Sequence, residues 1–215
     1  MREGIRVTDT QGNPLFTIGH SNHTAERLIE LLRQHGITAV VDVRSSPYSK
    51  HVPHFDRELL GQALSEQGMD YVYAGGELGA RPRSLQCYRD GRADFQCIRK
   101  AAAFAQGLSR LRELAGKQRV AVLCAEKDPL DCHRMILVCR ALRTAGLQIR
   151  HIHADGRAES HEDAERRLVH SVGVERTLFE PDLTDRELLE RAYDIQAGRI
   201  AYGGEVPQTA RQRGG

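Results

Sequence analysis

Residues 120–142 read VAVLCAEKDPLDCHRMILVCRAL, and this stretch changes character twice. An apolar, β-branched run ends at Cys124, a mostly polar connection follows, and apolar residues at helical spacing begin near Cys132. A short buried strand that leads through a polar loop into a helix is typical of the repeating unit of a parallel sheet. The stretch therefore predicts an α/β protein.

The same alternation occurs on both sides of this stretch. The segments with strand character are residues 15–20, 37–44, 69–76, 119–126 and 147–156, and those with helical spacing are 21–36, 55–68, 104–116 and 131–146. Thr24 is expected to cap the first helix, and Gly36 follows its end. Apolar strands alternating with amphipathic helices favour an open, doubly wound, Rossmann-like fold. We expect a mostly parallel sheet of five or six strands with helices on both faces.

The pattern also divides the chain. We expect an N-terminal lead-in over residues 1–14, an α/β domain over 15–155, a C-terminal helical extension over 156–203 and a flexible tail over 204–215. Residues 75–100 form a long basic insertion within the α/β domain, which is expected to be functional or disordered.

The composition restricts the classes of protein to which this chain could belong. The 215 residues carry a net charge of +2, and no apolar run approaches the roughly 18 residues that a membrane-spanning helix needs. The first residues lack the apolar block of a secretory signal, so a cytoplasmic protein is expected, with its five cysteines as free thiols, Cys87 and Cys97 included. The net charge does not favour a nucleic-acid partner, although the basic insertion over residues 81–100 supplies cations for one.

Polar side chains follow four of the predicted strands. In open α/β sheets, ligands bind at the carboxyl ends of the strands, so these side chains are expected to share one rim. The candidate catalytic residues are His20, Glu126, Cys132 and His133. The candidate anion-binding residues are Ser21, Asp42, Arg44, Ser45, Ser46, Lys127, Arg134 and His153.

Each candidate carries an alternative interpretation. Arg44 and Arg134 suit a phosphate or carboxylate, yet they also suit internal pairing with Asp42 or Glu126. Cys132 is expected in the first turn of a helix, capped by Asp128 or Asp131, where it acts as a nucleophile or as a structural thiol.

The remaining thiols and imidazoles are expected to be structural or solvated. Cys124 and Cys139 are expected to be ordinary buried thiols, and four histidines are expected to be solvated: His51, His54, His161 and His170. His20 and His133, with Glu126, are the candidates for proton transfer because imidazole titrates near neutral pH.

Other site types fit less well. A zinc site would combine Cys124, Cys132 and His133 with His20 or His153, but the two cysteines are too widely spaced for a structural zinc motif. Adjacent side chains on a helix also diverge by about 100°. No metal site is therefore predicted, and the residues identify no cofactor. Residues 74–80, AGGELGA, lack the glycine spacing of a dinucleotide fingerprint.

Five motifs together carry a family resemblance. They are TIGHSN (17–22), VVDVRSSPYSK (40–50), YVYAGGELGARPR (71–83), VLCAEKDPLDCHR (122–134) and HIHADG (151–156). They resemble the bacterial and archaeal family catalogued as domain of unknown function 488, over residues 15–155. The resemblance implies no particular activity.

The residues favour a small cytosolic enzyme, a hydrolase or transferase, acting on a phosphate-bearing or other small anionic molecule such as a nucleotide. The alternatives are a non-catalytic module that binds nucleotides or nucleic acid, and a protein that docks a partner chain.

Overall fold

The structure, a computed structural model, describes residues 13–143, 146–176 and 182–203. Residues 1–12 of the expected lead-in and the whole of the expected tail over 204–215 lie outside the described residues. The central element is a six-stranded sheet with the order β3-β2-β6-β1-β7-β8. Its strands are β1 (Leu15–Gly19), β2 (Ala39–Asp42), β3 (Asp70–Tyr73), β6 (Val120–Cys124), β7 (Ile149–Ile152) and β8 (Ala158–Ser160).

The sheet is doubly wound, as predicted. The first five of these strands pair in parallel, while β8 runs antiparallel to β7 at one edge. The chain leaves the neighbouring strands β2 and β6 toward opposite faces of the sheet, and the carboxyl ends of such a strand pair are the topological position where these folds bind ligands. The sequence pattern did not predict β8, which lies inside the segment expected to be a helical extension.

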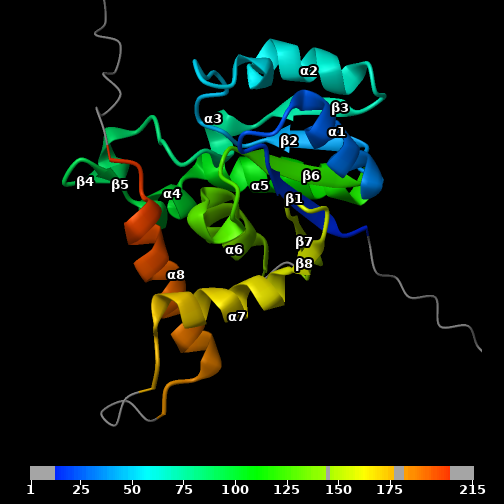
Figure 1. The fold of residues 1–215 in the computed structure, drawn as a ribbon. Helices are drawn as coiled ribbons and strands as arrows, with labels where there is room; N and C mark the ends of the chain where they lie inside the picture. Colours follow the sequence, from blue (N-terminus) through cyan, green and yellow to red (C-terminus); the bar gives the residue numbers. More distant parts are fainter. Residues whose placement is uncertain (1–12, 144–145, 177–181, 204–215) are drawn as a thin grey trace, which may run out of the picture.

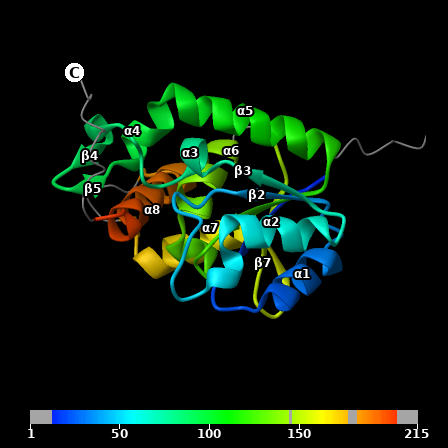
Figure 2. The same ribbon diagram turned by 90° about the horizontal axis from the view of Figure 1, so that it is seen from above.

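Helices α1 (Ala25–Gln34) and α2 (Arg57–Ser65) cover one face of the sheet (Figures 1 and 2). Alternate strand residues such as Phe16, Ile18 and Leu123 point to this face and join Leu28 and Leu60 in one apolar core. The Thr24 hydroxyl accepts a hydrogen bond from the backbone N–H of Arg27, so the predicted cap of α1 is confirmed.

The opposite face is covered by α5 (Ala102–Lys117), by the π-helix η4 (Arg134–Cys139) that continues into α6 (Arg140–Leu142), and by α7 (His161–Val172) (Figures 1 and 2). The predicted helix over 131–146 begins later than expected. The short 3₁₀ turn η3 (Pro129–Asp131) comes first, and Cys132 has extended backbone, with φ −131° and ψ 138°. The expectation that Cys132 lies in the first turn of a helix is therefore wrong.

The insertion over residues 75–100 is folded. It contains α3 (Gly75–Leu78), the 3₁₀ turn η2 (Leu85–Cys87), a hairpin of β4 (Tyr88–Arg89) and β5 (Arg92–Ala93), and α4 (Phe95–Lys100). Phe95 and Ile98 are buried in the core beneath α5. This insertion is thus part of the main apolar core.

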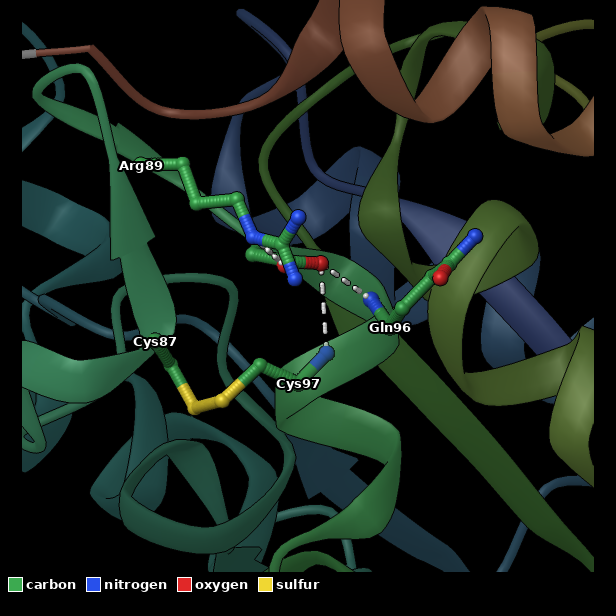
Figure 3. Close-up of a disulfide and its surroundings, with 5 residues drawn as sticks. Cys87, Arg89, Gln96 and Cys97 are labelled. Atoms are coloured by element: carbon green, nitrogen blue, oxygen red, sulfur yellow. Dashed lines mark hydrogen bonds and ion pairs between the residues drawn. A yellow bond between two sulfur atoms is a disulfide. The ribbon is translucent and has the colours of Figure 1, made fainter.

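Cys87 and Cys97 form a disulfide, so the expectation of free thiols is wrong for this pair. The hairpin reverses the chain and brings their Cα atoms to 5.2 Å, within the range that a disulfide spans. Figure 3 shows the bond at the start of α4, where the backbone N–H groups of Gln96 and Cys97 donate to the capping Asp94 carboxylate. The other three cysteines have free thiols.

The C-terminal helices α7 and α8 (Asp185–Ile200) pack on each other and on the sheet side that carries η4. Among the described residues, no helix has the length and apolar character that a membrane span requires.

A chain of buried polar side chains connects α7 and α8 to the sheet. His151 on β7 lies 2.7 Å from the Thr17 hydroxyl and 3.0 Å from the His161 ring, and the Tyr193 hydroxyl lies 3.2 Å from the other nitrogen of His161. Tyr193 donates onward to Glu165 at 2.9 Å. His161 is 2% exposed, so the expectation that it is solvated is wrong. It faces the core because helical spacing places it on the same side of α7 as Ala164 and Leu168.

This network predicts loss of stability in acid. Burial lowers the pKa of His151 well below its ordinary range, and burial also lowers the pKa of His161. The unfolded chain takes up protons near pH 6.5, whereas the folded imidazoles stay neutral, so stability is full above that pH and falls below it. Between pH 7 and pH 5, we expect His151 to account for a loss on the order of 2 kcal/mol in the free energy of unfolding.

Urea unfolding at several pH values measures the effect. His151→Gln should flatten the dependence, and His170→Gln, at an exposed position on α7, should leave it unchanged. Equal slopes for the parent and His151→Gln would contradict the assignment.

Candidate functional site

A pocket of about 190 Å³ lies over the carboxyl ends of β2 and β6. The residues that line it are Arg44, Ser45, Ser46, Ala80, Arg81, Cys124, Ala125, Glu126, Asp131, His133, Ile200 and Tyr202. They come from the loop after β2, the insertion, the loop after β6 and the end of α8. Segments distant in sequence therefore meet at the edge of the sheet where the sequence placed the site.

Four reactive side chains gather at the base of this pocket. The Glu126 Oε2 atom accepts hydrogen bonds from the thiols of Cys124 at 3.0 Å and Cys132 at 2.9 Å. The Cys124 sulfur lies 3.4 Å from Nδ1 of His133. One potential ligand atom from each of the four residues lies within 4.8 Å of all the others, so this Cys/Glu/His cluster has the composition and size of a metal site.

Local backbone structure explains the convergence. The loop leaves β6 at Cys124, turns back through η3, and presents Cys132 on extended backbone directly before the helix. Because Cys132 is extended and His133 begins the helix, the two side chains reach the same point. The expectation that the side chains of Cys132 and His133 diverge, as neighbours on a helix do, is therefore wrong.

The orientation of His133 is fixed from outside the cluster. Its Nε2 atom lies 3.0 Å from the carbonyl oxygen of Val43, which accepts hydrogen bonds and cannot donate one. Nε2 therefore carries the hydrogen, and in the neutral ring the lone pair of Nδ1 faces the thiols. Burial lowers the pKa of His133, but the hydrogen bond and charge of Cys132 outweigh it, and the net shift is upward.

The two buried thiols have different acidities. Burial raises the pKa of both, and for Cys124 the neighbouring Cys132 and Glu126 raise it further. For Cys132, the hydrogen bond from Cys124 and the positive charge of Arg134 reverse the effect, so its pKa is held well below the ordinary value. Burial also raises the pKa of the Glu126 carboxyl. Of the two buried thiols, Cys132 is therefore the more acidic.

Arg134 lies beneath the pocket and does not line it. Its side chain is fully buried and donates to the carbonyl oxygens of Glu126 at 2.7 Å and Lys127 at 3.1 Å. Its backbone N–H donates to the Cys132 sulfur at 3.4 Å. Within the part of the chain that the structure describes, the Arg134 Nε has no hydrogen-bond partner. Arg134 thus holds the loop and supplies positive charge below the thiols.

Arg44 lines the pocket but is paired internally, which is the alternative raised from the sequence. Its guanidinium donates to both carboxylate oxygens of Asp42, at 3.0 and 2.6 Å, and to the carbonyl of Phe55 at 2.8 Å. The remaining nitrogen lies 3.2 Å from Nε2 of His20. Burial lowers the pKa of His20 to about 4, so this ring is neutral at pH 7 and positions Arg44 from outside the pocket.

Of the other predicted residues, Ser45 and Ser46 line the pocket, whereas Ser21, Lys127 and His153 do not. The Ser21 hydroxyl bonds to its neighbour Asn22, and Lys127 is exposed. His153 pairs with Glu159 of β8 at 2.8 Å in a separate charged group that includes Arg167. The predicted rim is thus divided between the pocket and the β7–β8 edge.

Three pocket groups were not predicted as site residues, namely Arg81, Asp131 and Tyr202, and Cys124 was assigned to the core alone. The Arg81 guanidinium stacks over the Tyr202 ring at 4.1 Å from its centroid, and its backbone N–H donates to the Ser45 hydroxyl at 3.0 Å. Arg81 and Asp131 lie within two of the five family motifs, residues 71–83 and 122–134, and this membership was the sequence signal that could have identified them. The contact with Tyr202 requires tertiary structure, because more than a hundred residues separate the two side chains.

Glycines allow the loops to approach this closely. A Cβ atom on Gly19 would lie 1.7 Å from the carbonyl oxygen of Glu126, and one on Gly75 would lie 1.9 Å from that of Arg44. A Cβ on Gly79 would lie 2.4 Å from the Ser45 hydroxyl. The AGGELGA segment therefore packs α3 against the loop after β2, a role unrelated to dinucleotide binding.

These motifs coincide with a family match. A family model described as "Domain of unknown function DUF488" matches residues 24–141, more than half of the chain. The chain belongs to this family. Searches of curated proteins and of solved structures gave no significant match. In this DUF488 member, the matched region contains the four reactive side chains and Arg81, whereas Ile200 and Tyr202 lie outside it.

Gly19→Ala should disturb the site through the backbone. The added methyl group collides with the Glu126 carbonyl, and overpacking of this kind costs about 1–3 kcal/mol. The free energy of unfolding in urea measures the loss. Gly116→Ala, where no atom lies within 4 Å of the added methyl group, is the matched control and should be neutral or stabilising. A Gly19→Ala protein as stable as the parent would show that the loop lies elsewhere.

Proposed function

We propose that this protein is a small enzyme, a hydrolase or transferase, whose reactive centre is the cluster of Cys124, Glu126, Cys132 and His133. The observation that supports it is the convergence of acid–base and thiol groups at the base of a pocket at the sheet's topological switch point. Polar groups are costly to bury, and clusters of this kind with shifted pKa values are concentrated at functional sites.

The substrate in this proposal is a compact molecule with an anionic group. The cationic group available for it is the guanidinium of Arg81, which is exposed and held in place by Tyr202. The Ser45 and Ser46 hydroxyls lie on the same wall as hydrogen-bond partners. A volume of about 190 Å³ is small for a ligand site, which favours a small phosphate-bearing or carboxylate-bearing substrate, or one end of a nucleotide.

Roles within the cluster follow from exposure. Glu126 is the exposed member and reaches both thiols, so it is the proposed carrier of protons between the centre and the substrate. Cys132 is 1% exposed and does not line the pocket. We therefore assign to Cys132 the charge of the centre, in place of the nucleophilic attack suggested by its position in the sequence.

Arg81→Ala provides the test. The parent should be stabilised by small anions such as inorganic phosphate or nucleoside monophosphates, by about 2.7 kcal/mol at a hundredfold excess over Kd. Loss of one charge-assisted contact should weaken binding roughly tenfold in Arg81→Ala. Thermal shift measures both effects, and Arg83→Ala, an exposed arginine outside the pocket lining, is the control. If Arg81→Ala and Arg83→Ala weakened anion binding equally, the anion would not bind in this pocket.

Nucleic acid, the alternative partner, receives less support from the insertion over residues 81–100. Arg89 pairs with Asp94, and Arg92 donates to backbone carbonyls of Gly198 and Ala201 at the end of α8. These cations therefore stabilise the fold. We expect weak binding to a labelled oligonucleotide, with an affinity that Arg81→Ala does not change. Fluorescence anisotropy at rising salt is the measurement, and tight binding that falls steeply with salt would favour the nucleic-acid alternative.

A further inference from the structure

We infer that Cys124, Cys132 and His133 hold a divalent zinc ion, with the Glu126 carboxylate at its fourth position. This inference deepens the proposed function, because it rests on the same four side chains as the proposed reactive centre.

The donor set suits this metal. Two thiolate sulfurs, one imidazole nitrogen and one carboxylate oxygen are the ligand types that zinc binds, and four is its usual coordination number in proteins. Bonds of about 2.0–2.3 Å in a tetrahedron separate the ligand atoms by roughly 3.3–3.8 Å. The observed separations are 2.9 and 3.0 Å from sulfur to oxygen and 3.4 Å from sulfur to nitrogen. Outward movements of a few tenths of an ångström would accommodate the ion.

His133 is oriented as a ligand. Its Nε2–H is directed to the Val43 carbonyl, so the Nδ1 lone pair points into the cluster. Metal-binding histidines commonly donate their second ring N–H to a carbonyl or carboxylate in this way.

Charge balance gives an independent reason. Two thiolates and one carboxylate carry three negative charges in a cluster with three buried members. A divalent cation and the fully buried Arg134 guanidinium carry three positive charges. The backbone N–H of Arg134 also donates to the Cys132 sulfur, a contact that stabilises a thiolate. The burial of Arg134 is therefore compensated when the metal is bound.

The exposure of the ligands indicates a catalytic type of site. Structural zinc sites are closed, whereas catalytic sites keep one position that exchanges with water or substrate. Here the exposed ligand is Glu126, on the pocket side. A zinc ion held by the two cysteines and His133 would activate a water molecule in the fourth position, and Glu126 would accept the proton of that water. A bond from the water oxygen to the electrophilic atom of the substrate would then form as the bond to the departing group breaks, and Glu126 would pass the proton to that group. This sequence is a hydrolysis with water as the only co-reactant.

The experiment measures metal directly. The full chain is purified under reducing conditions, dialysed against zinc and then against metal-free buffer, and its metal content is measured by mass spectrometry. We expect one zinc per chain in the parent and in Cys139→Ala, whose thiol is buried outside the cluster. Cys132→Ser should bind zinc at least roughly 100-fold more weakly, because it loses a direct ligand.

Cobalt substitution identifies the ligands without relying on activity. The cobalt form of the parent should show thiolate-to-metal charge-transfer absorption, which Cys124→Ser and Cys132→Ser should each reduce. Glu126→Gln should retain the metal and shift the visible bands of cobalt. Circular dichroism of each variant without metal shows whether it is folded, and Glu126→Gln, which keeps all three buried ligands, tests the site if the cysteine variants unfold.

Several outcomes would overturn the inference. Equal zinc content in the parent and in Cys132→Ser would show that the metal lies elsewhere. A Cys124–Cys132 disulfide that persists in protein purified under reducing conditions would indicate a redox pair in place of a metal site. Anion binding that depends on Arg81 in a metal-free protein would leave the proposed function standing without the metal. Stoichiometric zinc without anion binding would support the metal and refute the proposed substrate pocket.

Discussion

The site depends on the hydrogen bonds that the buried Arg134 guanidinium donates to the loop after β6. This guanidinium joins η4 to the loop after β6 through the carbonyl oxygens of Glu126 and Lys127, and it lies against Gly19 at the end of β1. A charge buried this completely is costly unless nearby groups compensate it. The carbonyl oxygens that Arg134 binds and the neighbouring Cys132 and Glu126 side chains provide that compensation, so the same charge stabilises the loop after β6 and the side chains clustered there.

The pocket is completed by parts of the chain that lie far from the central motifs. The backbone N–H of Ala93 donates to the Tyr202 carbonyl, Arg92 holds the end of α8, and Arg81 stacks on the Tyr202 ring. The Cys87–Cys97 disulfide braces the hairpin that carries Arg92 and Ala93. The expectation of a cytoplasmic protein rested partly on five free thiols. The disulfide contradicts that premise, since disulfides are uncommon in reducing compartments.

The order of strands and helices was predictable because it depends on local patterns. Buried parallel strands are apolar throughout, covering helices are apolar on one side, and Thr24 and Gly36 mark the ends of α1. The edge at which these polar side chains gather was predictable for a related reason, since strand ends in such sheets share one edge. Placement of individual side chains at that edge was less accurate. Ser45, Ser46, Glu126 and His133 reach the pocket, while Arg134 lies beneath it and His153 belongs to another group.

The sequence by itself determined the doubly wound sheet, the family and the edge at which reactive residues collect, because hydrophobic periodicity and motif order are properties of short segments. Tertiary structure decided which residues act together. One turn of 3₁₀ helix places Cys132 on extended backbone, so that it meets Cys124 and His133 where a regular helix would separate them. It also decided the burial of His161, the disulfide and the contact of Arg81 with Tyr202. These features depend on distances between segments far apart in the chain, which no local pattern encodes.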